Sequence, residues 1–265
     1  MRTASLPVYL VMVQKELLEL VRSFKLLWVP LVFVLLGIMQ PVSIYYMPLL
    51  LESAGNLPDG TVIDIPMPLG SEVLAQTLRQ FGTLGMLILA LASMGVVSGE
   101  RNSGAASLIL VKPVSTLSYI GSKWTSMLLL TWGSLSAGYL ASWYYTGLLI
   151  GEVAPGEVLG SLLAYGLWLS FATTMTLLFG TMLRSPAAAA FSSLGLSAAL
   201  SLLSGLFPKQ LGWNPGALSG YAYQLAADGV RNPDKLWWAV SATALLIALA
   251  LAASAALLGR SPAVD

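Results

Sequence analysis

Charged side chains are so unevenly distributed along this chain that their positions restrict how it can fold. Only 9% of its 265 residues are Asp, Glu, Lys or Arg, whereas a soluble globular protein contains roughly 25%. A membrane-spanning helix needs about 20 predominantly apolar residues to cross a hydrocarbon core of about 30 Å. Six stretches of 20 to 28 residues contain no charge, and each is long enough: 26–51, 80–99, 124–151, 158–183, 185–208 and 236–259.

These runs predict an all-α integral membrane protein with six transmembrane helices. Inside lipid every backbone polar group must find a partner within the protein, which favours helices for apolar runs of this length. We expect one transmembrane domain over residues 1–265, and a further short helix at 215–228 that dips back into the bundle. The expected spans are residues 26–50, 78–99, 122–150, 158–183, 187–207 and 236–259.

Residues 5–25 form an amphipathic pattern that precedes the first span. Lys15, Glu19 and Arg22 share one helical face. Such a helix is typical of segments that lie in the membrane interface with the apolar side down. The alternative is a cytoplasmic helix packed on its own soluble domain, but the chain contains no such domain. The opposite, apolar face comprises Leu6, Leu10, Val13, Leu17, Leu20, Val21 and Phe24.

The basic residues predict the orientation in the membrane. If the N-terminus is inside, the inner segments carry nine Lys and Arg residues and the outer segments carry four. Cytoplasmic loops are enriched in these residues. We therefore expect a multi-pass protein of the cell membrane with both termini in the cytoplasm.

Composition excludes several kinds of chemistry. The chain has no Cys and no His, so it cannot form disulfides, thiolate nucleophiles, Ser-His-Asp triads or the common zinc motifs. It also lacks a phosphate-binding loop, because Gly121-Ser122-Lys123 does not have the required spacing. A net charge of +1 gives no reason to expect nucleic acid. We expect no catalytic residue, metal or cofactor on this chain.

Ionisable residues are absent from the middle of every expected span. Arg79 comes nearest, and we expect it at the outer end of the second helix. Charged groups at mid-membrane usually mark ion or proton pathways, because they are costly there. Their absence argues against an ion-coupled carrier and against a membrane enzyme built on carboxylates.

A polar island, residues 99–123, separates the second and third spans. Glu100-Arg101 follows the second span directly, and Gly104 precedes the apolar turn 105–111, which ends at Lys112-Pro113. Ser115 or Thr116 can then cap the next helix through its hydroxyl. This pattern predicts a short amphipathic helix across the membrane surface. The alternative is an ordinary basic cytoplasmic loop.

The island also resembles a known signature. Gly-Glu-Arg, a following Gly, an apolar turn, Lys-Pro-Val-Ser and Tyr-x-Gly-x-Lys resemble the permease subunits of type-2 ABC exporters, the ABC-2 family. In that family the segment is a cytoplasmic coupling helix between helices 2 and 3 that docks into a groove of a separate ATPase. The resemblance implies that the residues coupling to the ATPase are Glu100, Arg101, Gly104, Leu108, Lys112, Pro113 and Lys123.

The resemblance further implies a complex of four chains. Two cytoplasmic ATPase subunits would bind ATP and Mg, and a second permease copy, identical or a close paralogue, would complete the pathway within the lipid. The second and fifth helices line the central cavity in this family. Here that face is uncharged and contains Thr83, Met86, Leu87, Ser93, Ser192, Ser193, Ser197, Leu200 and Ser204.

An uncharged cavity suits an amphipathic peptide or another lipophilic compound, with hydrophobic drugs and lipid-linked glycans as alternatives. Two other functions are compatible with the sequence. One is a membrane scaffold that binds a partner through the island. The other is a passive channel or an ion-coupled carrier.

Small residues at four-residue spacing predict where helices approach closely, because such rows let backbones come together in lipid. We expect close contacts, within the bundle or at a subunit interface, at Gly95–Gly99, Ser134–Gly138, Gly147–Gly151 and along the alanines at 244, 248, 252 and 256.

Overall fold

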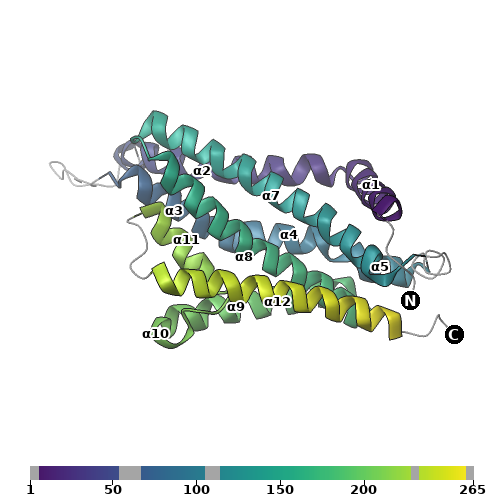
Figure 1. The fold of residues 1–265 in the computed structure, drawn as a ribbon. Helices are drawn as coiled ribbons and strands as arrows, with labels where there is room; N and C mark the ends of the chain where they lie inside the picture. Colours follow the sequence, from purple (N-terminus) through teal and green to yellow (C-terminus); the bar gives the residue numbers. More distant parts are fainter. Residues whose placement is uncertain (1–5, 54–66, 105–113, 228–232, 261–265) are drawn as a thin grey trace.

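The computed structural model describes residues 6–53, 67–104, 114–227 and 233–260, and all regular elements within these ranges are helices. The expectation of an all-α protein is therefore confirmed for the described residues. The long helices form a bundle (Figure 1). In chain order the elements are α1 (Leu6–Arg22), α2 (Lys25–Ser53), α3 (Gly70–Gln80), the π-helical turn η1 (Phe81–Gly85), α4 (Met86–Ser93), α5 (Gly95–Asn102), α7 (Thr116–Leu149), α8 (Pro155–Met182), α9 (Pro186–Leu206), α10 (Pro208–Leu211), α11 (Ala217–Ala227) and α12 (Pro233–Arg260).

Within the described ranges, five helical segments are long and apolar enough to cross a membrane. They match the first, second, fourth, fifth and sixth expected spans, although the second begins at Gly70 rather than at residue 78. Two of these segments, α8 and α9, are joined by a very short turn and begin with Pro155 and Pro186, which suit a first helical turn. The five segments are Lys25–Leu50, Gly70–Asn102, Pro155–Met182, Pro186–Leu206 and Pro233–Gly259.

The expected third span falls within α7, which differs from the other five. It is 34 residues long and runs along the bundle beside α2 and α8 (Figure 1). Its many Ser, Thr, Tyr and Trp side chains lower its hydropathy, so a count of six spans stays a prediction. Several of these polar groups are buried and paired; for example, the Ser142 and Thr77 hydroxyls lie 2.8 Å apart.

The second membrane segment is one helical path with two irregular points. At η1 the Phe81 ring packs on Phe33 of α2, with centroids 4.9 Å apart. Gly85 is required there, because a Cβ atom would lie 2.9 Å from the Phe33 ring. Near Met94 the path changes from α4 to α5, and Lys25 Nζ donates a hydrogen bond of 2.8 Å to the Ala92 carbonyl. These contacts attach the segment to α2 at both points.

The closest crossing joins α2 and α7. A Cβ atom on Gly37 would lie 2.1 Å from the Gly138 carbonyl oxygen, and one on Gly138 would lie 2.5 Å from the Phe33 carbonyl oxygen. The expected close contact at Ser134–Gly138 is therefore confirmed at Gly138, and Ser134 is buried beside it. Gly37 is a lone glycine in a long apolar run, and its close contact with α7 was not predicted from the sequence.

The expected close contact at Gly147–Gly151 is confirmed at Gly151, because a Cβ atom on Gly70 of α3 would lie 2.7 Å from the Gly151 carbonyl oxygen. The remaining small residues make no close contact within the described bundle, and a subunit interface at them stays a prediction. Cβ atoms on Gly95, Gly99 and Gly147 would meet nothing within 4 Å. The row Ala244, Ala248, Ala252 and Ala256 is exposed. Spacing alone identifies a face that permits close approach, but larger neighbours decide which face turns inward. In α12 the buried row is Thr243, Ile247, Ala250, Ser254 and Leu258.

The expected helix at 215–228 is confirmed as α11. It packs against α3, α8 and α9, at the end of the bundle opposite α1 and α5 (Figure 1). Gly216 allows this position, because a Cβ atom there would lie 2.3 Å from the Leu200 backbone in α9.

The crossing of α2 and α7 gives a stability test. We expect Gly138→Ala to lower the thermal unfolding temperature, because overpacking a tight contact costs about 1–3 kcal/mol. Gly133→Ala is the matched control, since a Cβ atom at this other glycine of α7 would meet nothing within 4 Å. Equal unfolding temperatures for the two purified variants would contradict the crossing.

Candidate functional site

The candidate site is a junction of charged groups at the end of α5, where the second membrane segment meets the island. Glu100 lies in the last turns of α5 and binds three groups from two other helices. Its Oε1 accepts a hydrogen bond from Lys15 Nζ of α1. Its Oε2 accepts a hydrogen bond of 2.6 Å from the Tyr119 hydroxyl of α7 and lies 3.0 Å from Lys123 Nζ. We call this set, together with Glu16 and Glu19, the ionic junction.

Lys123 is the centre of the ionic junction. Its side chain is fully buried, and its Nζ lies 2.9 Å from Glu16 Oε1 as well as near Glu100. The ammonium also lies 5.0 Å from the centre of the Tyr119 ring. Tyr119 and Lys123 are four residues apart in α7, so they lie on the same helical face. A buried charge needs such partners, because desolvation costs several kcal/mol per ion.

Glu16 was missed in the sequence, where Lys15, Glu19 and Arg22 defined the polar face of α1. In the structure α1 packs on α7 through a row spaced by four residues, Met12, Glu16 and Leu20, and all three are buried. This row could have indicated the burial of Glu16 from the sequence. A carboxylate that lies between two apolar residues on one helical face predicts a buried partner of opposite charge.

The predicted apolar face of α1 divides between the bundle and the surface, because Leu20 is buried and Val13 and Leu17 are half-buried. Leu6, Leu10, Val21 and Phe24 are all more than half exposed. The helix lies at the end of the bundle where α2 begins, and it runs in a different direction from α2 (Figure 1). Phe24 forms the corner between them with φ of 57°, a left-handed conformation that is rare for a bulky residue. Contact with lipid at this face stays a prediction.

Arg101 and Asn102 extend the junction to α8. The Arg101 guanidinium donates to the Thr181 carbonyl, and Asn102 Nδ2 donates a hydrogen bond of 2.9 Å to the Arg184 carbonyl. The last carbonyl groups of a helix lack partners within the helix and carry partial negative charge, so a guanidinium binds well there. Glu100 thus pairs with Lys123 of the following helix, whereas its neighbour Arg101 binds the end of α8.

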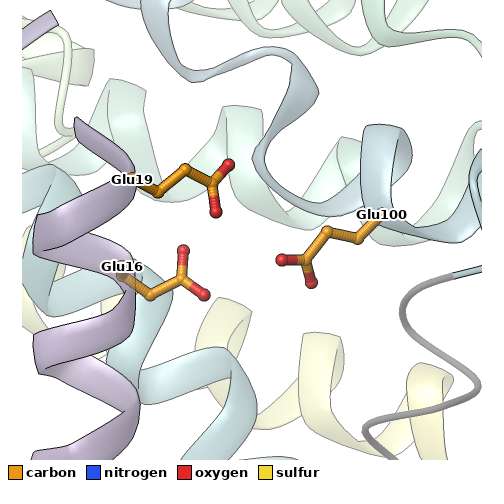
Figure 2. Close-up of side chains that lie close together, drawn as sticks. All are labelled: Glu16, Glu19 and Glu100. Carbon is orange, nitrogen blue, oxygen red and sulfur yellow. The ribbon is translucent and has the colours of Figure 1, made fainter. Parts of the chain in front are cut away.

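Three carboxylates of the junction lie close together (Figure 2). Oxygens of Glu16, Glu19 and Glu100 lie within 4.8 Å of one another, and their side chains point toward a shared space. Lys15 Nζ lies 3.0 Å from Glu16 and 3.3 Å from Glu19, and it also binds Glu100. With Lys123, two ammonium groups therefore take the positions that a metal cation would need. The arrangement is an ion-pair network.

Lys15 shows how the junction balances burial against pairing. Partial burial lowers the pKa of its ammonium, but hydrogen bonds and Coulomb attraction from Glu100 and Glu16 raise it by more. The net result is a pKa above the ordinary range for lysine. The group is therefore charged at neutral pH, and Lys15 links α1 to α5.

The remaining coupling residues fall only partly within the described residues. Gly104 has φ of +76°, a left-handed conformation that glycine adopts without strain after a helix ends. The expected cap is present at Ser115, whose Oγ accepts a hydrogen bond of 3.1 Å from the Ser118 amide. Leu108, Lys112 and Pro113 lie outside the described residues, and so does the expected coupling helix.

The expected cavity-lining residues divide into two groups. Thr83 and Leu87 are exposed on one face, and Ser192 and Leu200 are half-buried. The others are buried by neighbouring helices of the same chain; Ser193, for example, forms a hydrogen bond of 2.8 Å with Thr176 of α8. Their contact with a pathway stays a prediction. The buried set is Met86, Ser93, Ser193, Ser197 and Ser204.

The buried ammonium predicts a strong and rescuable effect on stability. We expect Lys123→Met to destabilise the protein by about 3–5 kcal/mol, because two buried carboxylates lose a shared partner. Lys209→Met, at an exposed lysine of α10, is the control. Adding Glu16→Met to Lys123→Met should restore part of the loss, since one uncompensated charge is removed. Thermal unfolding of the purified variants measures both effects, and equal stability of the Lys123→Met and Lys209→Met proteins would contradict the network.

Comparison with known proteins identifies the family to which this chain belongs. A transmembrane protein of Bacillus subtilis (strain 168) named YxlG, itself described as uncharacterized, is 40% identical over 242 residues, which cover 91% of this chain and 93% of the relative. The profile of the family described as ABC-2 family transporter protein matches residues 10–214. This range includes most of α1, the membrane segments through α9 and the whole ionic junction. The chain therefore belongs to the ABC-2 family of transporter proteins.

Proposed function

We propose that this chain is the transmembrane permease subunit of an ATP-driven exporter and that the ionic junction couples it to a separate ATPase. Family membership makes the chain a membrane component of a transporter. The sequence has no phosphate-binding loop, so ATP hydrolysis requires another polypeptide. The observation that carries the proposal is the attachment of α5 to three other helices directly beside the island.

The contacts of α5 support a route for coupling. Glu100 ties it to α1 and α7, while Arg101 and Asn102 tie it to the end of α8. The short turn after α8 leads into α9, the fifth expected span. A force on the island would therefore act on α5 and α7 together and reach α9 through the end of α8. The proposed cavity lies between α4 and α9, so this route ends at the pathway.

The complete transporter in this proposal contains two copies of this chain, or one copy and a paralogue, with two ATPase subunits that hold ATP and Mg. The exposed part of the proposed cavity face includes the uncharged residues Thr83 and Leu87. Such a face suits an amphipathic peptide or another lipophilic cargo. We also propose that α7 is the expected third span and completes a set of six, since it leads from the α5 end of the bundle to the opposite end (Figure 1).

Coupling gives the central test of this function. The chain is co-expressed with a candidate ABC ATPase subunit from the same genome, and copurification, ATP hydrolysis and export are measured. We expect the Glu100→Gln chain to copurify with the ATPase. ATP hydrolysis should then continue with less export, because the neutral amide binds Lys123 and Lys15 more weakly. We expect Leu108→Asp to lose the ATPase, since truncating a buried anchor costs about 2 kcal/mol or more. Lys112→Ala should have a smaller effect, as rim charges act mainly on rate.

Two results would contradict the proposal. One is a chain that copurifies with no ATPase, which would favour a scaffold. The other is export that continues when Glu100→Gln, Leu108→Asp and Lys112→Ala are combined. Export that follows an ion gradient rather than ATP would indicate a carrier.

The proposed orientation is tested separately. The chain has no cysteine, so single cysteines can be introduced without a background signal. In intact cells a membrane-impermeant thiol reagent should label cysteine at Gly156 or Asp59 and should leave cysteine at Asn102 or Ser185 unlabelled. The reverse pattern would place α1, α5 and the ionic junction on the outer side.

A further inference from the structure

Arg79 is a charged residue on the exposed surface of a membrane helix. It is the tenth residue of the segment that begins at Gly70, and its side chain is exposed. Among the residues that the structure describes, no carboxylate forms an ion pair with it. A charge close to the hydrocarbon is costly unless it has a partner. The guanidinium is therefore a candidate site for binding an anion.

The depth of Arg79 limits what that anion can be. Arg79 and Glu100 are 21 residues apart on one helical path, which corresponds to about 31 Å at 1.5 Å per residue. This is close to the thickness of the hydrocarbon core, about 30 Å. If the ionic junction lies at one boundary, Arg79 lies at the other, at the level of lipid head groups.

Two tyrosines place further hydrogen-bond donors beside Arg79. The guanidinium lies 5.5 Å from the centre of the Tyr223 ring of α11. The Tyr223 and Tyr165 hydroxyls lie 3.1 and 3.3 Å from the position that a Cβ atom on Gly82 would take, so both converge one turn beyond Arg79. Tyr165 is fully buried, and among the described residues its hydroxyl has no hydrogen-bond partner. Buried hydroxyls without a partner are uncommon and call for a water or a ligand.

An exposed apolar row continues from Arg79 toward the middle of the membrane. Leu84, Leu87 and Leu91 are 44%, 38% and 44% exposed. Leu84 and Leu87 are three residues apart and Leu87 and Leu91 are four apart, which turns the side chains by about −60° and +40° around an α-helix. The three leucines therefore share one face. Thr83 and Arg79 precede Leu87 by four and eight residues, so this face continues toward Arg79. The exposed acid Glu72 lies on the other side of Arg79, two turns toward the start of α3.

We propose that Arg79, Tyr223 and Tyr165 bind the phosphate of an anionic phospholipid, whose acyl chain lies along Leu84, Leu87 and Leu91. The guanidinium supplies a positive charge and a fork of donors that matches a phosphate. The tyrosine hydroxyls supply two more donors, and the leucines supply the apolar surface. The site needs neither the ATPase nor a second copy of the chain, so it does not depend on the proposed exporter function.

Native mass spectrometry of the purified chain in a neutral detergent tests this site. Phosphatidylglycerol is the probe, phosphatidylcholine tests the need for net negative charge, and glycerol 3-phosphate tests the need for the acyl chains. We expect one phosphatidylglycerol to be retained in preference to phosphatidylcholine, and no retention of glycerol 3-phosphate. Arg79→Gln should weaken this binding about tenfold or more, since hydrogen bonds to charged groups contribute about 1.5–3 kcal/mol. Tyr165→Phe should weaken it by a smaller factor.

Matched variants make the result specific. Lys209→Gln removes the same charge from α10 at the same end of the bundle and should bind like the parent. Thr83→Asp places an acid on the exposed turn after Arg79 and should weaken binding, while Thr83→Asn should not; this pair serves if Arg79→Gln does not fold. Equal binding by the parent and Arg79→Gln, or by Thr83→Asp and Thr83→Asn, would overturn the proposal. Equal losses for Lys209→Gln and Arg79→Gln would overturn it too, as would retention of glycerol 3-phosphate.

Discussion

The junction between α1, α5 and α7 depends on the single buried ammonium of Lys123. It lies about 3 Å from carboxylates of both Glu16 and Glu100, which also share the more exposed side chain of Lys15. Because the two acids come from different helices, the ammonium holds together elements that are far apart in the sequence. A buried network of this kind contributes less to stability than apolar packing would. Its value lies in fixing which helix faces meet.

Away from this junction, the helices contact one another mainly through closely approaching backbones and small hydroxyl groups. Ser and Thr side chains of α7, α8 and α9 bond to one another across helix contacts, as in Thr176 with Ser193. Apolar area alone cannot select partners in lipid, because the tails are as apolar as leucine. Glycines such as Gly37 and Gly216 allow the backbone contacts, and the hydroxyls define the register. This explains why α7 is long but comparatively polar.

Much of this fold could be predicted from the spacing of charges, because lipid excludes charged residues from long stretches and requires helices within them. The amphipathic α1 and the Ser115 cap could also be predicted from local patterns. The burial of Glu16 could not, because it depends on which face of α1 meets α7. The outward direction of the alanine row of α12 could not be predicted for the same reason: four-residue spacing describes one helix and contains no information about its neighbour. The exposure of Arg79 likewise depends on α11, which packs beside α3 but does not cover the Arg79 side chain.

The crossing of Gly37 and Gly138 has a mechanical consequence. Two helices in backbone contact at one point resist sliding past each other, yet they can tilt about that point, which then acts as a fulcrum. Lys123 lies 15 residues before Gly138 and Leu149 lies 11 residues after it, so the arms of the lever are about 22 Å and 16 Å long. A tilt that moves the Lys123 end of α7 in one direction moves the far end in the opposite direction by about three quarters as much. A rigid helix with such a pivot would close one side of a membrane pathway as it opens the other.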